Sequence, residues 1–506
     1  MFRHRPFFLA CAFVCAASFC AFVASGQERR ASVVPNASLA LAPCEVASAR
    51  EGSKEQARCG TFEVFENRAA RKGRKIALKI VVFPATGADK APDPLFYIPG
   101  GPGSSATEDA PYIAQQFAAV RTRRDLVFVD QRGTGGSNPL DCVLFDPQDL
   151  QSYLGDFFPL AAVRKCRELL ETRADLKLYT THIAMDDLNE VRAALGYERI
   201  NISGGSYGTR ATQDFLKRHR QHVRTVVLQG LSPTNQLMPR DFPQHTERAL
   251  RGVTDECAAD EACRAAFPNL RAEVKAVLER LLRGPVEVEV KRQPEGESVR
   301  VRLSRDLAGE ALRYMLYQPG AAGRIPLLIH LAAGGNFTPL AESALFYRQR
   351  LVATGSNGMY LSVTCAEDLP WIKPAEGERN AADTFLGDYR LRQQRAACAL
   401  WPRAAIPKDY AQPTRSDVPA LILTGQWDPV TPPVYGETAA RHLPNSLHAV
   451  VPHGGHAFGG LEGTDCVQNL ITEFVNRGTV KGLDTSCLNN IRRRGFLLKL
   501  AEPKKQ

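Results

Sequence analysis

The sequence predicts an α/β fold with a mostly parallel central sheet and a mainly helical insertion. Short apolar runs that end in glycine-rich loops are typical of strands buried on both faces of a parallel sheet. Helix-like segments separate several of these runs, and strands that alternate with helices indicate an α/β architecture. A long stretch between two later runs has helical patterning instead, which predicts an insertion over one end of the sheet.

Length and composition agree with this fold class. The 506 residues are 44% hydrophobic and 23% charged, which are ordinary globular values and exclude a disordered, collagen-like or coiled-coil chain. Lysine and arginine number 64 and aspartate and glutamate 54, so the formal net charge is +10. This charge is spread along the chain without an aromatic-interleaved basic motif, so we do not expect nucleic-acid binding.

The strands are expected in a fixed order along the chain. Regular structure is expected to begin near Cys59, and residues 76–83 (IALKIVVF) have strong β propensity. The later runs are short and apolar, and they lie at residues 95–98, 126–129, 200–202, 225–228, 420–423 and 448–451.

Helices are expected between these strands and throughout the insertion. In residues 186–195, Leu188, Val191 and Leu195 share one face, and Gly196 follows as a stop signal. A second helix is expected over 209–218. The insertion adds helical segments at 250–263, 270–282 and 307–317, with a small hairpin at 286–302.

The pattern predicts one core domain split by one lid, rather than the three domains that about 150 residues per domain would suggest. The expected parts are a signal peptide (1–26), an exposed leader (27–58), the first part of the core (59–231), a helical lid (232–410), the second part of the core (411–477) and a solvated C-terminal tail (478–506).

The N-terminus has the three-part pattern of a secretory signal peptide. Arg3 and Arg5 precede an uncharged apolar run over 7–24, and small residues close that run at 24–26. We therefore expect a secreted or periplasmic protein with no membrane span after cleavage. One alternative is a retained anchor helix, because the run is nearly long enough to span a bilayer. A second is lipid attachment at Cys11, but the apolar stretch before this cysteine is too short for a typical lipoprotein signal.

Cysteine usage supports export. Three of the 13 cysteines lie in the expected signal peptide, and the ten that follow are an even number, which favours disulfides in an exported chain. Pairing of near neighbours is the simplest connectivity: Cys44 with Cys59, Cys142 with Cys166, Cys257 with Cys263, Cys365 with Cys398, and Cys466 with Cys487. No C-x-x-C pair occurs, so neither a metal nor a cofactor is expected.

A candidate nucleophile follows the run at 200–202. Gly204-x-Ser206-x-Gly208 matches the G-x-S-x-G nucleophile elbow, in which a serine on a tight strand-to-helix turn exposes its hydroxyl. The motif follows a predicted strand and opens a predicted helix. This context favours an elbow over an ordinary glycine turn.

A nucleophilic serine needs a base and an orienting acid, which follow it in the order acid then histidine in this type of fold. His456 is the expected base because the glycines before it give its loop freedom, and His453 is the fallback. Asp428 is the expected acid because it lies just past the run at 420–423. Asp130 precedes Ser206 and is interpreted as structural. The alternative interpretation of His453 and His456 as a metal site is not supported, because no carboxylate ligand and no helical i,i+4 spacing accompany them.

Two backbone amides should form an oxyanion hole. One is expected from Tyr207, directly after the nucleophile. The other should come from the glycine loop at 99–103 (PGGPG), with Gly101 preferred and Gly100 next. This loop lacks the lysine and Ser/Thr of a phosphate-binding P-loop.

These residues resemble a known family, the secreted α/β-hydrolases of the tripeptidyl aminopeptidase group, which are related to prolyl iminopeptidases. The segments that carry the likeness are CGTFEV at 59–64, PGGPGSS at 99–105, DQRGTGGS at 130–137, GGSYGT at 204–209, GQWDPVTP at 425–432 and GGHAF at 454–458. Prolyl iminopeptidases begin the oxyanion loop with histidine, whereas this chain has Pro99, so the resemblance is to the broader group.

The resemblance implies an α/β-hydrolase fold and a serine exopeptidase that releases residues or short peptides from peptide N-termini through an acyl-enzyme. Such an enzyme needs an acid to hold the substrate's α-ammonium group. Glu367 and Asp368 are the candidates, with a solvated loop as the alternative. The same machinery cleaves esters and lactones, so an esterase acting on small esters is the second hypothesis. A non-catalytic binding protein is a third, but it predicts a missing triad member.

Overall fold

A computed structural model of the chain describes residues 39–48, 52, 54–292 and 296–500. The described residues belong to one unit of the chain, Ser38–Gln506. The expected signal peptide, with its three cysteines, and the leader up to residue 38 lie outside the described residues. Among the described helices, none is long and apolar enough to cross a membrane.

A nine-stranded sheet forms the centre of the fold, in the order β1-β2-β3-β5-β4-β6-β7-β10-β11. From β5 to β11 neighbouring strands are parallel, and from β1 to β5 they pair antiparallel along the edge. The predicted strand runs are all present in it. The strands are β1 (Ala42–Ala47), β2 (Lys54–Phe65), β3 (Lys75–Phe83), β4 (Leu95–Ile98), β5 (Leu126–Val129), β6 (Ile200–Gly205), β7 (Val223–Gln229), β10 (Ala420–Gly425) and β11 (Ser446–Val451).

The prediction that regular structure begins near Cys59 is wrong, because β1 already starts at Ala42. β1 pairs with β2, and the Cys44–Cys59 disulfide joins the two strands. The sequence of β1 (APCEVA) is made mostly of small residues, and its side chains are exposed or half-buried because it is an edge strand. Such a strand lacks the apolar pattern that identifies a buried one.

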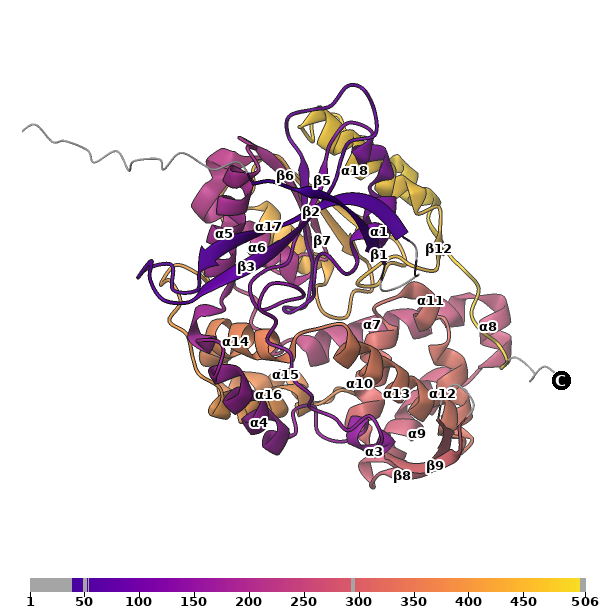
Figure 1. The fold of residues 1–506 in the computed structure, drawn as a ribbon. Coiled ribbons are helices and arrows are strands. Elements are labelled where there is room, and N and C mark those ends of the chain that lie inside the picture. The colour runs from indigo at the N-terminus through magenta and orange to yellow at the C-terminus, as the bar shows by residue number, and fades with distance from the viewer. Residues whose placement is uncertain (1–38, 49–51, 53, 293–295, 501–506) are drawn as a thin grey trace, which may run out of the picture. The chain divides into compact units, whose positions relative to one another are not determined.

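Helices cover both faces of the sheet (Figure 1). On one face, Ile422 of β10 packs in the same core as α5 (Thr181–Ala194), α6 (Tyr207–His219) and α17 (Pro433–Ala440). On the other face, Leu421 and Leu423 share a core with α1 (Ala110–Gln116), α2 (Ala118–Arg121) and α18 (Asp465–Arg477). Burial on both faces explains why the parallel strands are apolar without alternation. The helix expected at 186–195 lies within α5, which begins earlier at Thr181.

The insertion forms the larger part of a helical cap, which lies at one end of the sheet in Figure 1. Helix α9 matches the expected 270–282, and β8 and β9 form the expected hairpin. The helix expected at 250–263 is divided, because Asp260 ends α7 and caps α8. The cap elements are α7 (Phe242–Ala259), α8 (Glu261–Ala266), α9 (Leu270–Leu282), β8 (Val286–Lys291), β9 (Ser298–Leu303), α10 (Arg305–Met315), α11 (Pro319–Ala322), α12 (Ile325–Ala333), α13 (Thr338–Ala353), α14 (Asn357–Glu367), α15 (Pro374–Ala381) and α16 (Tyr389–Leu400).

A second stretch of chain joins the cap, which the sequence did not predict. Helices α3 (Leu150–Tyr153) and α4 (Leu160–Glu171) lie beside the insertion in Figure 1, although residues 59–231 were expected to form only core. Arg167 of α4 donates a hydrogen bond to the Leu400 carbonyl at 2.9 Å, and the Arg302 amide donates to Gln151 of α3 at 2.7 Å. We use "cap" for the insertion together with α3 and α4.

The five near-neighbour disulfides predicted from the sequence are present. Cys257–Cys263 and Cys365–Cys398 lie inside the cap, Cys142–Cys166 ties α4 to the preceding loop, and Cys466–Cys487 ties the start of α18 to the segment that follows this helix. The C-terminal segment is not simply a solvated tail. Ile491 is fully buried, and Arg493 contacts Glu256 of α7 at 2.6 Å.

Candidate active site

Ser206 occupies a tight turn between β6 and α6. Its φ of 54° is in the left-handed region that non-glycine residues rarely adopt, as expected for a nucleophile elbow. Both flanking glycines are required by close packing. A Cβ on Gly208 would lie 2.1 Å from the Ile98 carbonyl oxygen, and one on Gly204 would lie 2.6 Å from the Gly208 carbonyl oxygen. The sequence motif therefore has the strand–turn–helix context that its interpretation needs.

His456 and Asp428 form a hydrogen-bonded pair on neighbouring loops. Asp428 lies past the end of β10 and His456 past the end of β11, and the Nδ1–Oδ2 distance is 2.8 Å. The carboxylate is fully buried and also accepts hydrogen bonds from the Val430 amide and from the amide and hydroxyl of Thr431. These contacts hold the histidine ring in one orientation.

The environment of Asp428 fixes the proton on His456. Burial acts to raise the pKa of Asp428, but the charge of His456 and the hydrogen bonds from His456 and Thr431 outweigh it and hold this pKa below its ordinary value. An ionised carboxylate only accepts hydrogen bonds, so Nδ1 of His456 must be the donor. Nε2 is then the nitrogen that is free to act as a base.

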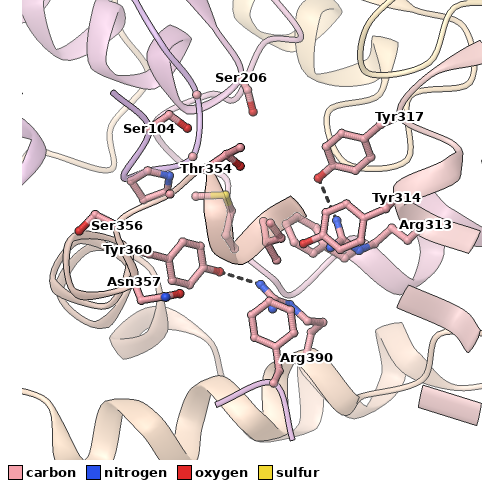
Figure 2. A pocket seen from close by; sticks show the side chains of 18 of the residues that line it. Ser104, Ser206, Arg313, Tyr314, Tyr317, Thr354, Ser356, Asn357, Tyr360 and Arg390 are labelled. Carbon is pink, nitrogen blue, oxygen red and sulfur yellow. Dashed lines mark hydrogen bonds between the residues drawn. The ribbon is translucent and has the colours of Figure 1, made fainter. Parts of the chain in front are cut away.

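Ser206 and His456 line the same cavity, which has a volume of about 390 Å³. Parallel strands bring them together, since the loops after β6 and β11 both lie at the carboxyl edge of the sheet. In Figure 2 the Ser206 hydroxyl points into the space enclosed by the other labelled side chains. The volume lies in the range of small-molecule and short-peptide sites.

The glycine loop after β4 lies against the serine. A Cβ on Gly100 would be 3.1 Å from the Ser206 Cβ, and both Gly100 and Gly101 line the cavity. Gly101 has a φ of 113° and no room for a side chain, because its Cβ would lie 2.7 Å from the Gly103 amide. The Tyr207 amide is the first of α6, where helical amides lack an intrahelical acceptor. Tyr207 therefore directly follows Ser206 in the chain, and Gly101 lines the same cavity as Ser206.

Asp130 holds this glycine loop in place. Its buried carboxylate accepts hydrogen bonds from the Ser105 hydroxyl, the Ala106 amide, and the amide and hydroxyl of Thr107, at 2.8–2.9 Å. It accepts one more from the Gly136 amide at 2.9 Å. Its interpretation as a structural residue is confirmed.

Comparison with known proteins agrees with this geometry. A model described as the alpha/beta hydrolase fold matches residues 93–281, and one described as TAP-like protein matches residues 383–487. The chain belongs to the TAP-like α/β-hydrolases. Each matched segment contains parts of the site, with Ser206 in the first and Asp428 and His456 in the second. The matched families and the site geometry together support a serine hydrolase.

Two relatives illustrate this membership. Serine protease Hip1 of Mycobacterium tuberculosis is 26% identical over 520 residues, covering 92% of this chain and 94% of the relative. Tripeptidyl aminopeptidase of Streptomyces lividans is 31% identical over 189 residues, covering 34% of this chain and 35% of the relative. The likeness to Hip1 therefore extends over nearly the whole of both proteins.

Glu367 and Asp368 of this TAP-like hydrolase do not line the cavity, contrary to the role predicted for them. Both are buried and already have internal partners. Glu367 accepts hydrogen bonds from the amide and hydroxyl of Thr181 at 2.7 Å and from the Tyr410 hydroxyl. Asp368 pairs with the fully buried Arg210 at 2.8 Å. Asp368 Oδ2 has no hydrogen-bond partner among the described residues, but it is buried and Asp368 is not among the residues that line the cavity. The contacts therefore favour a structural role for both carboxyls.

The other two C-terminal histidines are held away from the serine. His453 contacts Glu256 at 2.7 Å, and His448 contacts the Thr424 hydroxyl at 2.8 Å. Neither lines the cavity, which leaves His456 as the histidine beside Ser206.

The cap supplies a second set of cavity residues that sequence reasoning missed. They are mostly aromatic or cationic, and they come from α10, α14, α16 and the loop before α4: Phe157, Phe158, Arg313, Tyr314, Tyr317, Tyr360 and Arg390. No local motif marks these positions. They meet only because distant helices of the cap converge, so their residue types alone gave no signal.

Proposed function

We propose that this TAP-like hydrolase is an exported exopeptidase that releases residues or short peptides from peptide N-termini through an acyl-enzyme. The observation that carries the proposal is one cavity that holds Ser206 on its elbow beside the ordered His456–Asp428 pair. The names of two relatives, a serine protease and a tripeptidyl aminopeptidase, support a peptide substrate. Five disulfides support an oxidising compartment and hence export.

The proposed reaction assigns each residue one task. Ser206 Oγ attacks the scissile carbonyl while His456 Nε2 takes its proton, and Asp428 stabilises the imidazolium that forms. The Tyr207 and Gly101 amides donate to the oxyanion. His456 then gives the proton to the departing amine as the carbon–nitrogen bond breaks. A water molecule, deprotonated by His456, attacks the acyl-enzyme and releases the N-terminal product from Ser206.

The cap would act as the lid that limits access to chain ends. It contributes residues from both of its stretches of chain to the cavity, Phe157 and Phe158 from one and Tyr317 from the other. A long folded polypeptide cannot enter a cavity of about 390 Å³, whereas the end of an unfolded peptide can. This enclosure favours an exopeptidase over an endopeptidase.

One observation favours the second candidate, an esterase or lactonase. No described residue that lines the cavity is aspartate or glutamate, so the described wall offers no carboxylate for a substrate α-ammonium group. The aromatic side chains would suit a small acyl or aryl ester equally well. The two candidates share the same serine chemistry and differ in their requirement for a free amino terminus.

Amidase assays distinguish them. The purified mature protein should be tested on aminoacyl- and tripeptidyl-p-nitroanilides with free and with acetylated N-termini, beside a p-nitrophenyl ester. An exopeptidase cleaves the free peptides and rejects the acetylated ones. Cleavage of acetylated peptides, or of the ester alone, would contradict the exopeptidase proposal. A folded Ser206→Ala variant should be inactive on every substrate, and full activity in this variant would contradict the site assignment.

Export is tested separately. Mass spectrometry of the protein recovered from outside the cytoplasm should find a chain that starts after residue 26 and carries no free thiols. A full-length chain recovered with membranes would contradict cleavage.

A further inference from the structure

Two buried arginines form part of the cavity wall. Arg313 of α10 and Arg390 of α16 line the cavity that holds Ser206, and their residues are 1% and 4% exposed. In Figure 2 Arg390 lies at the far side of the cavity from Ser206, with Arg313 beside it. The triad chemistry uses neither of them, so their presence needs another reason.

The arginines are part of a buried cluster with excess positive charge. Arg313 pairs with Glu310 at 2.8 Å, and Arg348 is a third buried cation whose hydrogen bond goes to the Asp156 backbone carbonyl. Arg390 Nε is 4.0 Å from the other oxygen of Glu310, which is beyond hydrogen-bond distance. We call Arg313, Arg348 and Arg390 with Glu310 the arginine cluster. It contains three cations and one carboxylate.

Neighbouring acids do not balance this charge. Asp306 and Asp388, on α10 and directly before α16, both pair with the exposed Arg392. Burial acts to raise the pKa of Glu310, but the charges of the three arginines outweigh it and hold the pKa below its ordinary value. Glu310 is therefore already ionised. The cluster keeps a net positive charge that a further anion would neutralise.

Arg390 has donors without partners. Its Nη2 donates to the Tyr360 hydroxyl at 3.0 Å, and Tyr360 in turn donates to Gln394. The guanidinium centre lies 3.3 Å from the centroid of the Phe157 ring. Its Nε and Nη1 are buried and have no hydrogen-bond partner among the described residues; Nε faces Glu310 Oε1 at 4.0 Å, and that oxygen accepts no hydrogen bond either. Because buried unpaired donors are costly, a ligand oxygen that accepted from this guanidinium would be stabilised.

We propose that the arginine cluster binds a carboxylate of the substrate, so that the enzyme prefers substrates with an acidic group set away from the scissile bond. A carboxylate fits because it neutralises the excess positive charge and accepts charge-assisted hydrogen bonds, which are stronger than those between neutral groups. This inference rests on the proposed function, since it names the substrate class of the same cavity. The carboxylate comes either from an acidic side chain in the acyl part or from the free C-terminus of a short peptide.

The cluster is connected to the catalytic base. Arg313 Nη1 donates to the Tyr317 hydroxyl at 2.9 Å, and the Tyr317 ring packs edge-on against His456 with centroids 4.7 Å apart. A bound carboxylate would thus lie against residues that also contact the base. The contacts from Arg313 through Tyr317 to His456 therefore connect the proposed anion site with the catalytic base in one cavity wall.

Matched substrates test the preference. One set is tripeptidyl-p-nitroanilides with glutamate or glutamine at each position in turn, and the other is short peptides with a C-terminal carboxylate or amide. We expect kcat/KM to be about ten- to hundredfold higher for the acidic member of one set, and that set identifies the source of the carboxylate. Equal rates within both sets would overturn the proposal.

Variants assign the effect to the cluster. In Arg390→Gln the preference should disappear, so that the ratio of kcat/KM between the acidic and the uncharged member of the set falls to about one. Arg392→Gln, on the exposed side of the same helix, should keep the preference. If Arg390→Gln does not fold, Arg390→Lys and Tyr360→Phe weaken the same contact with smaller changes. An acid preference that survives in all folded variants would overturn the assignment.

A binding experiment separates this inference from the proposed function. Titration of glutarate into the Ser206→Ala protein by calorimetry should show saturable binding that is lost in Ser206→Ala/Arg390→Gln and kept in Ser206→Ala/Arg392→Gln. If the wild-type protein cleaves no peptide yet this pattern is seen, the exopeptidase proposal fails and the carboxylate site stands. Identical titrations for all three proteins would overturn the carboxylate site.

Discussion

The core and the cap both line the cavity, but they do so in different ways. The core contributes Ser206, His456 and the glycine loop at 99–103, which are held at the ends of parallel strands and fixed by backbone geometry. The cap contributes aromatic rings and arginines from helices that are far apart in the sequence. In the proposed function, the core side breaks the scissile bond and the cap side selects the substrate. That proposal assigns reaction type and specificity to separate parts of the chain.

The largest expected effect is on the core side. Asp428→Asn should lower kcat by about 10⁴-fold, because an asparagine amide can donate to Nδ1 of His456 and stabilise the wrong tautomer. Steady-state kinetics on the best substrate measures it, with KM expected to change little. A loss of less than about tenfold in a folded variant would mean that Asp428 does not orient the base.

The elbow can be broken through its backbone. Gly208→Ala places a Cβ 2.1 Å from the Ile98 carbonyl oxygen, so β4 and α6 must separate. We expect an activity loss of about 10²-fold or more and a fall in Tm of several degrees. The matched control is Gly334→Ala in the cap, where the new Cβ meets only ordinary contacts at 3.5 Å. If both variants behave alike, the elbow packing is not critical.

Two disulfides, one in the cap and one at the edge of the core sheet, allow these regions to be compared at a similar loss of stability. Cys365–Cys398 joins α14 and α16, the helices that carry Tyr360 and Arg390, whereas Cys44–Cys59 joins two edge strands. Replacing either pair by alanine should lower the free energy of unfolding by about 2–4 kcal/mol. Only the Cys365/Cys398 variant should also lose activity, by about three- to tenfold, because its cap wall loosens. Denaturant unfolding and kcat/KM measure the two effects, and equal activity in both variants would contradict the role of the cap in selection.

The smallest effect concerns the pH dependence of stability. Burial raises the pKa of Glu367 to about 7, although hydrogen bonds from Tyr410 and Thr181 and the charge of Arg210 act in the opposite direction. Between its ordinary pKa of 4.5 and about 7, the folded state therefore holds a proton that the unfolded chain releases. The free energy of unfolding should fall as the pH rises through this window, by up to about 3 kcal/mol for this group.

Glu367→Gln removes this titration and leaves a side chain of the same shape. Its stability should depend less on pH between 5 and 8 than that of the wild-type protein. Urea unfolding at several pH values measures the slope. An unchanged slope would contradict the raised pKa and show that Glu367 does not change its protonation state in this pH range.

The sequence predicted the core better than the cap for a physical reason. Strands buried on both faces are uninterrupted apolar runs, so β4 to β7, β10 and β11 were all located. The exposed edge strand β1 was missed because its pairing leaves no hydrophobic pattern. Helices α3 and α4 were assigned to the core by their place in the chain, whereas their hydrogen bonds attach them to the cap.

In the candidate site too, the core residues were predicted from the sequence better than the residues of the insertion. Ser206 and Gly101 were identified because a strained turn and a close backbone approach require glycines at set positions, and such requirements appear in the sequence. Glu367 and Asp368 were chosen as acids in the insertion, but tertiary packing buries both against internal partners and away from the cavity wall. The choice failed because residue type does not reveal which buried partner a carboxyl will meet.

The sequence by itself determined the fold class and the order of the serine, aspartate and histidine, since both depend on local pattern and spacing. It also offered near-neighbour pairing as the simplest disulfide hypothesis, which the structure confirmed. Only the tertiary structure decided what surrounds the serine. The position of Arg390 against Phe157, with donors left unpaired beside Glu310, comes from α16 packing across a loop more than two hundred residues earlier in the chain. Side-chain contacts between distant segments impose no backbone requirement on either segment, and for that reason they are visible only once the chain has folded.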